Sequence, residues 1–199
     1  AHRKVCVDFR PNRKMGFMMR IVGHGNGCYD TANKHSRLKE TSMVYRMIFN
    51  QTAYFGRGAI KEIPGVAKSH GFTKAFIVTD PVLLETGTVK KVTDVLDEAG
   101  MPYEVFDNVK PNPPVECIQD GVAKFAASGA DFLIGLGGGS PQDTCKGIGI
   151  ITANPEFADV LSLEGVADTK NPSVPIFGVP TTAGTASETT INYVVTDTA

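Results

Sequence analysis

The sequence predicts an α/β fold built around a parallel sheet, and three observations lead to this prediction. Short apolar runs alternate along the chain with amphipathic segments of helical period, as in strand–helix–strand units. Residues 132–136 form an apolar run typical of a strand that is covered on both faces. A glycine turn and a helix start follow this run directly, so the chain reads as strand, tight turn and helix.

The remaining elements follow from the same patterns. Residues 47–49 and 53–55 predict an N-terminal β-hairpin around a polar turn. A helix is expected from Ile60 to Ala67, interrupted or restarted at Pro64. The segment 88–99 carries an apolar stripe that ends at Gly100, and a second stripe begins at Val115 and ends at Gly129. Further strands are expected at residues 74–78, 103–106, 176–179 and 191–196.

The glycine turn has the composition of an anion site. Three glycines allow a tight turn and a close approach of a ligand, and Ser140 can cap the helix with Pro141 in its first position. A helix N-terminus presents free N–H groups and a positive dipole end, and phosphate is the usual anion there. Neither the common dinucleotide fingerprint nor the phosphate-loop pattern is present. The turn taken alone also fits a tight connection that binds nothing.

Polar features follow several strands of the predicted sheet. Asp80, the segment 137–140 and the pair Thr181–Thr182 all come where an apolar run stops. Because ligands of parallel sheets bind beyond the carboxyl ends of the strands, these features should meet at one edge. The sequence therefore predicts a Rossmann-like nucleotide-binding domain.

A family resemblance adds to this interpretation. The segments 137–143, GGGSPQD, and 180–188, PTTAGTASE, resemble the signatures of the iron-containing (group III) alcohol dehydrogenases. The segments 55–58, 77–80 and 111–113 fit at their expected places, and the resemblance runs from about Met43 to the last residue. It implies NAD as the cofactor, a small alcohol or aldehyde as the substrate and a homodimer.

The resemblance also assigns roles to particular residues. Asp80 would bind the adenine ribose and repel a 2′-phosphate, although an ordinary turn residue before Pro81 fits its position equally well. Asn112 would touch the cofactor, whereas its place among prolines also suits an Asn that holds its own turn. The helix start would cradle the pyrophosphate, and threonine hydroxyls would follow the cofactor towards the nicotinamide. The remaining expected cofactor-binding residues are Gly138, Gly139, Ser140, Pro141, Gln142, Asp143, Thr181, Thr182, Thr185, Thr190 and Val194.

No catalytic or metal-binding residue is assigned. In the resembling family one Asp and three His of a following all-helical domain hold Fe²⁺ or Zn²⁺, and we expect that domain to be absent from these 199 residues. We therefore expect no turnover from this chain alone. A glycerol dehydrogenase or dehydroquinate synthase type of relative, or a non-catalytic nucleotide-binding fragment, remains an alternative.

Composition sets the remaining expectations. The formal net charge is −1, but residues 1–42 carry +6 and residues 43–199 carry −7, so the main part offers no basic face for nucleic acid. No apolar run is long enough for a membrane span, and four cysteines without a metal-binding spacing suit the cytoplasm. Residues 1–42 predict a basic leader without regular structure, and residues 43–199 the NAD-binding domain. We expect the natural start at Met43, because Lys39-Glu40 can be encoded by a ribosome-binding sequence.

Overall fold

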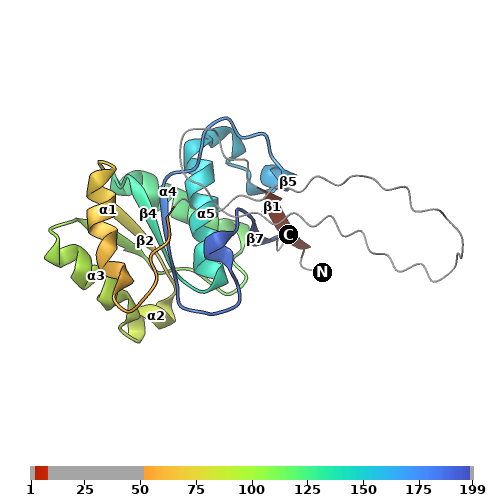
Figure 1. Ribbon diagram of the computed structural model, residues 1–199. Helices are drawn as coiled ribbons and strands as arrows, with labels where there is room; N and C mark the ends of the chain where they lie inside the picture. Colours follow the sequence, from red (N-terminus) through yellow and green to blue (C-terminus); the bar gives the residue numbers. More distant parts are fainter. Residues whose placement is uncertain (1–2, 9–51, 198–199) are drawn as a thin grey trace, which may run out of the picture.

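The computed structural model describes residues 3–8 and 52–197 (Figure 1). Its main sheet has four parallel strands in the order β3, β2, β4, β6. The prediction of an α/β fold with a parallel sheet is confirmed. The strands are β2 (Ala75–Val78), β3 (Tyr103–Phe106), β4 (Phe132–Gly137) and β6 (Ile176–Pro180).

Helices cover both faces of this sheet. Alternate residues of a strand point to opposite faces, so Ala75 and Ile77 pack with α1 (Ile63–Ser69) and α3 (Thr88–Glu98). Phe76 and Val78 pack on the other side with α4 (Val115–Ser128) and α5 (Gly139–Ala153). The result is a three-layer domain, with α1 and α3 on one side of β2 and β4 (Figure 1). The near-continuous apolar runs of β2 and β4 follow from this double coverage.

Several short elements connect the main ones. Pro64 lies at the start of α1, directly after the 3₁₀ turn η1 (Ala59–Glu62), so the expected restart at this proline is confirmed. Helix α2 (Pro81–Glu85) was not predicted, because we expected only the end of a strand at Asp80 and Pro81. The other short elements are the 3₁₀ turns η2 (Pro155–Phe157), η3 (Val160–Leu163) and η4 (Ser187–Thr189).

A second, smaller sheet packs against α5. It consists of β5 (Gly165–Val166), β1 (Arg3–Asp8) and β7 (Tyr193–Asp197), with β1 antiparallel to β7 and parallel to β5. Tyr193 and Val195 are buried in a core shared with Ile150 and Ile151 of α5. The last predicted strand therefore joins this sheet and not the parallel one.

The N-terminal part differs from the expectations in two places. Strand β1 lies within residues 1–42, for which we expected no regular structure. The expected hairpin is wrong in its second half, because residues 53–55 form no strand, and Phe55 is 94% exposed. Residues 47–49 and the expected boundary at residue 43 lie outside the described residues, so the domain division stays a prediction.

Candidate functional site

The glycine turn joins β4 to α5 with no loop between them. Gly137 has φ of 147°, and a Cβ at this position would lie 2.5 Å from the Pro141 ring, so only glycine fits. Gly138 is the extended N-cap residue, and no side chain caps the helix. The expectation that Ser140 caps α5 is therefore wrong, because the helix already begins at Gly139 and places Ser140 in its first turn.

The start of α5 has the free donors of an anion site. The first four N–H groups of a helix have no partner within the helix, and they carry the positive end of its dipole. Pro141 lacks an N–H, and its ring packs against the position of Gly137. The amide of Gln142 lies 3.4 Å from the carbonyl oxygen of Gly138. The amides of Gly139 and Ser140 are therefore the donors best placed for an anion.

The loop between β6 and β7 packs against this turn. The amide of Thr181 donates to the carbonyl oxygen of Gly137 at 3.0 Å. A Cβ on Gly138 would lie 3.0 Å from Thr182 Oγ1, and one on Gly139 would lie 3.6 Å from the methyl carbon of Thr185. The absence of side chains at the turn thus allows the threonine loop to approach the helix start closely.

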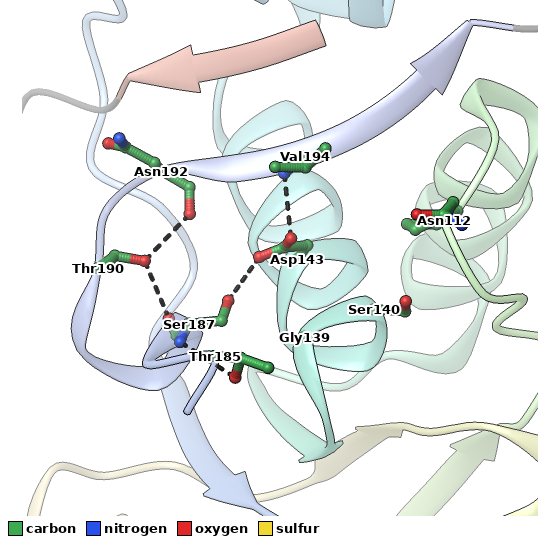
Figure 2. A pocket seen from close by; sticks show the side chains of 10 residues that line it. Asn112, Gly139, Ser140, Asp143, Thr185, Ser187, Thr190, Asn192 and Val194 are labelled. Carbon is green, nitrogen blue, oxygen red and sulfur yellow. Dashed lines mark hydrogen bonds between the residues drawn. The ribbon is translucent and has the colours of Figure 1, made fainter. Parts of the chain in front are cut away.

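A pocket of about 350 Å³ opens between the start of α5, this loop and the Asn112 loop (Figure 2). Seven of the predicted cofactor-binding residues line it, so the structure gathers residues from distant parts of the chain. Three further lining residues were not predicted. The predicted ones are Asn112, Gly139, Ser140, Asp143, Thr185, Thr190 and Val194, and the additional ones are Pro113, Ser187 and Asn192.

Six predicted residues do not line this pocket. Thr181, Thr182 and Gly138 lie beside it through the contacts described above. Pro141 and Gln142 are buried, and Gln142 Nε2 donates to the carbonyl oxygen of Gly135 at 2.6 Å. The side chains of Pro141 and Gln142 therefore act in packing α5 on β4. The sixth residue, Asp80, follows the neighbouring strand.

Asp80 caps α2 at the same edge of the sheet. Its Oδ1 accepts the amide of Leu83 at 3.0 Å. Strands β2 and β4 are parallel neighbours, and a Cβ on Gly137 would lie 3.3 Å from Leu83 Cδ1. Asp80 and the glycine turn thus follow adjacent strands at one edge of the sheet, as the sequence predicts. The alternative interpretation of Asp80, a turn residue before Pro81, corresponds to this helix cap.

Asn112 holds an uncommon backbone conformation. Its φ is 50°, in the left-handed region, and prolines precede and follow it. The loop is tied to β7 because the amide of Thr196 donates to the carbonyl oxygen of Pro113 at 2.9 Å. The side chain of Asn112 faces the pocket from the side opposite Thr190 and Asn192 (Figure 2).

Asp143 joins α5 to the two segments that face it. Its Oδ1 accepts the Ser187 hydroxyl at 2.5 Å, and its Oδ2 accepts the amide of Val194 at 3.1 Å (Figure 2). The carboxylate thus connects α5 to η4 and to β7.

Lys146 joins the hydrogen-bond network of Asp143 and Ser187. It was not among the residues predicted for the site. Its buried Nζ lies 3.6 Å from Asp143 Oδ1 and donates to Ser187 Oγ at 2.9 Å. Burial disfavours the charged form and lowers the pKa of Lys146 to about 8, while the nearby Asp143 carboxylate partly opposes this shift. The spacing of three residues, which places both side chains on one helix face, was the available signal.

Other features of the described ranges limit the chemistry. Residues 3–8 and 52–197 contain no group of three or more His, Cys, Asp or Glu that could hold a metal ion. Over the same ranges no helix has the length and apolar character needed to cross a membrane. Cys117 and Cys145 are free and buried, and burial raises the pKa of both thiols. The metal implied by the resemblance therefore finds no site among these residues.

Comparisons with known proteins identify the family. A family model described as iron-containing alcohol dehydrogenase matches residues 50–199. The chain belongs to the iron-containing alcohol dehydrogenase family. Lactaldehyde reductase of Escherichia coli K12 is 57% identical over 155 residues, which cover 78% of this chain and 41% of that protein.

Two further alcohol dehydrogenases are similar to this chain. The NAD-dependent methanol dehydrogenase of Bacillus methanolicus is 40% identical over 144 residues, 72% of this chain and 37% of that protein. The solved structure of an alcohol dehydrogenase from Oenococcus oeni aligns with a TM-score of 0.68 at 36% identity, over 76% of this chain and 39% of that one. The chain thus spans about two-fifths of the length of the curated relatives it matches.

Proposed function

We propose that this chain binds NAD at the glycine turn and supplies the nucleotide-binding part of an oxidoreductase. That enzyme would move hydride between a small alcohol or 1,2-diol and its aldehyde. The names of the relatives support an alcohol and an aldehyde as the substrate classes. The observation that carries the proposal is the pocket at the start of α5, where free amides meet hydroxyl and amide side chains. NAD, when bound, supplies the hydride chemistry, and the residues of this chain bind and orient it.

The pocket fits a dinucleotide in its hydrogen-bond donors. A diphosphate would accept hydrogen bonds from the amides of Gly139 and Ser140 at the positive end of the helix dipole. The hydroxyls of Thr185 and Thr190 and the amide of Asn112 line the same pocket and can donate to sugar or carboxamide oxygens. No step is assigned to a metal, since the described residues contain no group of three or more His, Cys, Asp or Glu that could hold one.

Asp80 supports NAD over NADP. Its carboxylate lies at the end of the strand next to β4, where an adenine ribose extends from a diphosphate at the turn. One of its oxygens caps α2, which leaves the other free to accept a ribose hydroxyl. A 2′-phosphate at that place would be repelled by the carboxylate.

Titration calorimetry with NAD⁺ and NADP⁺ on the full chain tests the proposal. We expect NAD⁺ to bind and NADP⁺ to bind more weakly. Ser140→Asp places a negative charge in the pocket and should abolish NAD⁺ binding, whereas Ser162→Asp makes the same change at an exposed position of η3 and should bind as the wild type does. Asp80→Asn keeps an oxygen for the cap and should reduce the preference for NAD⁺.

The outcomes separate the parts of the proposal. Wild-type protein that binds neither dinucleotide would show that the pocket has another use. Unchanged NAD⁺ affinity in Ser140→Asp would move the diphosphate away from the start of α5. Equal binding of NAD⁺ and NADP⁺ would remove the role of Asp80 alone.

Assembly and location belong to the same proposal. We expect a homodimer and a cytoplasmic location, the latter supported by two free buried cysteines among the described residues. Analytical ultracentrifugation would contradict the dimer if it found only monomer. We also expect small-molecule substrates and no nucleic acid partner.

A further inference from the structure

We propose that Lys146 is a positioning residue for dinucleotide binding, because its ammonium group holds residues 187–192 against α5. This segment forms one wall of the pocket, and Lys146 itself is not among the lining residues. The inference rests on the proposed function, since it concerns the same pocket. It adds a residue that acts on the cofactor only through its neighbours.

Among the described residues, the three hydrogen bonds that Lys146 donates all go to this one segment. Its Nζ donates to Ser187 Oγ at 2.9 Å, to Thr190 Oγ1 at 3.2 Å and to the carbonyl oxygen of Asn192 at 2.7 Å. An ammonium group has three protons, so the three acceptors use all of its donors. All three of these partners line the pocket. The lysine side chain is only 7% exposed, so it lies behind the wall that it holds.

Asp143 gives the lysine a second task. Its carboxylate lines the pocket and would place a negative charge close to a bound diphosphate. The Lys146 ammonium, 3.6 Å away, compensates that charge from the buried side. Since Asp143 also accepts from Ser187 and from the Val194 amide, the two side chains together fix the start of β7 and the preceding loop. Loss of the ammonium charge should therefore weaken NAD⁺ binding in two ways.

The charge of Lys146 should make the NAD⁺ affinity depend on pH. The ionisable groups that face it or its partner Asp143 are Cys145 of α5, Glu188 of η4 and Tyr193 of β7. Burial raises the pKa of Cys145 and of Tyr193, so both stay protonated between pH 7 and pH 9. The pKa of Lys146 is lowered to about 8, so its charge is lost within this interval. The NAD⁺ affinity of the wild type should therefore fall as the pH rises from 7 to 9.

The experiment measures the NAD⁺ dissociation constant by calorimetry at pH 7, 8 and 9. The variants are Lys146→Met, which keeps the length of the side chain without its charge, and Lys124→Met as the control. Lys124 also forms an ion pair within its helix, with Asp120, but it is exposed on α4. We expect Lys146→Met to bind about tenfold more weakly at pH 7 and to show no pH dependence. Lys124→Met should follow the wild-type profile.

Amide hydrogen exchange gives a second readout. In Lys146→Met the amides of residues 187–194 should exchange faster, while those of β2 and β4 stay protected. Uniformly faster exchange would mean that Lys146→Met loses its folded structure in general. The pH dependence of NAD⁺ binding to the wild type then tests the role of Lys146 without the variant. A wild-type affinity that does not change from pH 7 to pH 9 overturns the proposal.

Three other results would contradict the role of Lys146. Wild-type binding with an unchanged affinity in Lys146→Met contradicts the role of Lys146 and leaves the proposed function intact. A weaker affinity in Lys146→Met that still follows the wild-type pH profile also contradicts it, because another group then titrates. If the wild type binds no NAD⁺ at all, the proposed function fails, and this inference fails with it.

Discussion

Ala186 adopts a left-handed backbone conformation, with φ of 52°, in the loop that faces the glycine turn. A residue with a Cβ pays about 1–2 kcal/mol for this conformation, whereas glycine adopts it freely. Ala186→Gly removes this cost from the folded state. Glycine also makes the unfolded chain more flexible, which costs roughly 0.4–1 kcal/mol of stability, so the net effect should be a small gain. We expect a small rise in the urea midpoint.

The control for this prediction is the same substitution in a helix. Ala123 is exposed in the middle of α4, where Ala→Gly should cost about 1 kcal/mol. Opposite shifts of the two midpoints are the expected result. Equal losses in both variants would show that residue 186 does not hold the left-handed conformation in solution.

Asp131 fastens the start of β4 to the start of β2. Its carboxylate accepts the Thr73 amide at 2.8 Å, the Thr73 hydroxyl at 2.8 Å and the Lys74 amide at 3.1 Å. Burial pushes the pKa of Asp131 upward, but the hydrogen bonds from Lys74 and Thr73 outweigh it and hold the pKa below its usual value. Asp131→Asn should lower the free energy of unfolding at pH 7 by about 2 kcal/mol. The side-chain NH₂ of asparagine would replace one carboxylate oxygen and could not accept the hydrogen bonds that Thr73 and Lys74 donate.

The pH dependence of this effect has a defined sign. The folded-state pKa of Asp131 is lowered, so its contribution is complete above the unfolded-state value of about 4 and is lost as the pH falls through the folded-state pKa. Urea midpoints of the wild type and Asp131→Asn should therefore converge on acidification from pH 5 to pH 3. Asp94→Asn, which removes an exposed ion pair with Lys90, should leave the midpoint nearly unchanged. A gap that stays constant with pH would contradict this account.

At the scale of elements, α4 and α5 cross in close contact through two glycines. A Cβ on Gly121 would lie 2.4 Å from Ile148 Cδ1, and one on Gly147 would lie 2.7 Å from Ile118 Cδ1. The two helices thus place an isoleucine over each other's glycine. This reciprocal fit sets how closely α5, with the pocket at its start, approaches α4.

Gly121→Ala should disturb this crossing. Overpacking typically costs about 1–3 kcal/mol, against a gain in helix propensity of up to about 1 kcal/mol, so we expect a net loss. Ile148→Val removes the Cδ1 atom that the new methyl group would meet, so the double variant should be more stable than the sum of the single changes predicts. Urea unfolding of the three variants measures this coupling.

Gly65→Ala is the matched control for that cycle. Gly65 lies in α1, and no atom lies within 4 Å of a Cβ built on it. Only helix propensity acts there, so we expect a slight gain in stability. Strict additivity of Gly121→Ala and Ile148→Val would show that the two helices separate without cost.

The elements themselves could largely be predicted from the sequence. The apolar runs of β2 and β4 were recognisable because both faces of these strands are buried. Helices α3 and α4 were recognisable because each buries only one face, which gives an apolar stripe. Helix α2 was missed because Asp80 and Pro81 were read as the end of a strand, although the same pair caps and begins a helix. Strand β1 was missed because its pairing with β7 joins residues that lie far apart in the chain.

At the scale of the whole molecule, the site was predictable where it depends on strand ends. Ser140, Thr185 and Asn112 follow different strands, and the rule for parallel sheets brings such positions to one edge. The hydrogen bond between Lys146 and Ser187 was not predictable, because it joins residues 41 positions apart in the chain. The spacing of Asp143 and Lys146 indicated only that these two side chains share a helix face. The cap at Gly138 depends on how closely β4 runs into α5, which no residue pattern specifies.

The antiparallel pairing of β1 with β7 has a mechanical consequence. Arg3 faces Asp197 at one end of this ladder, and Val7 faces Tyr193 at the other. Tension applied between residues 3 and 197 would load the rungs one after another, as in a zipper, because they lie perpendicular to the strands. Tension between residues 7 and 197 would shear all the rungs at once, so an optical trap should record a low rupture force in the first geometry and a higher one in the second.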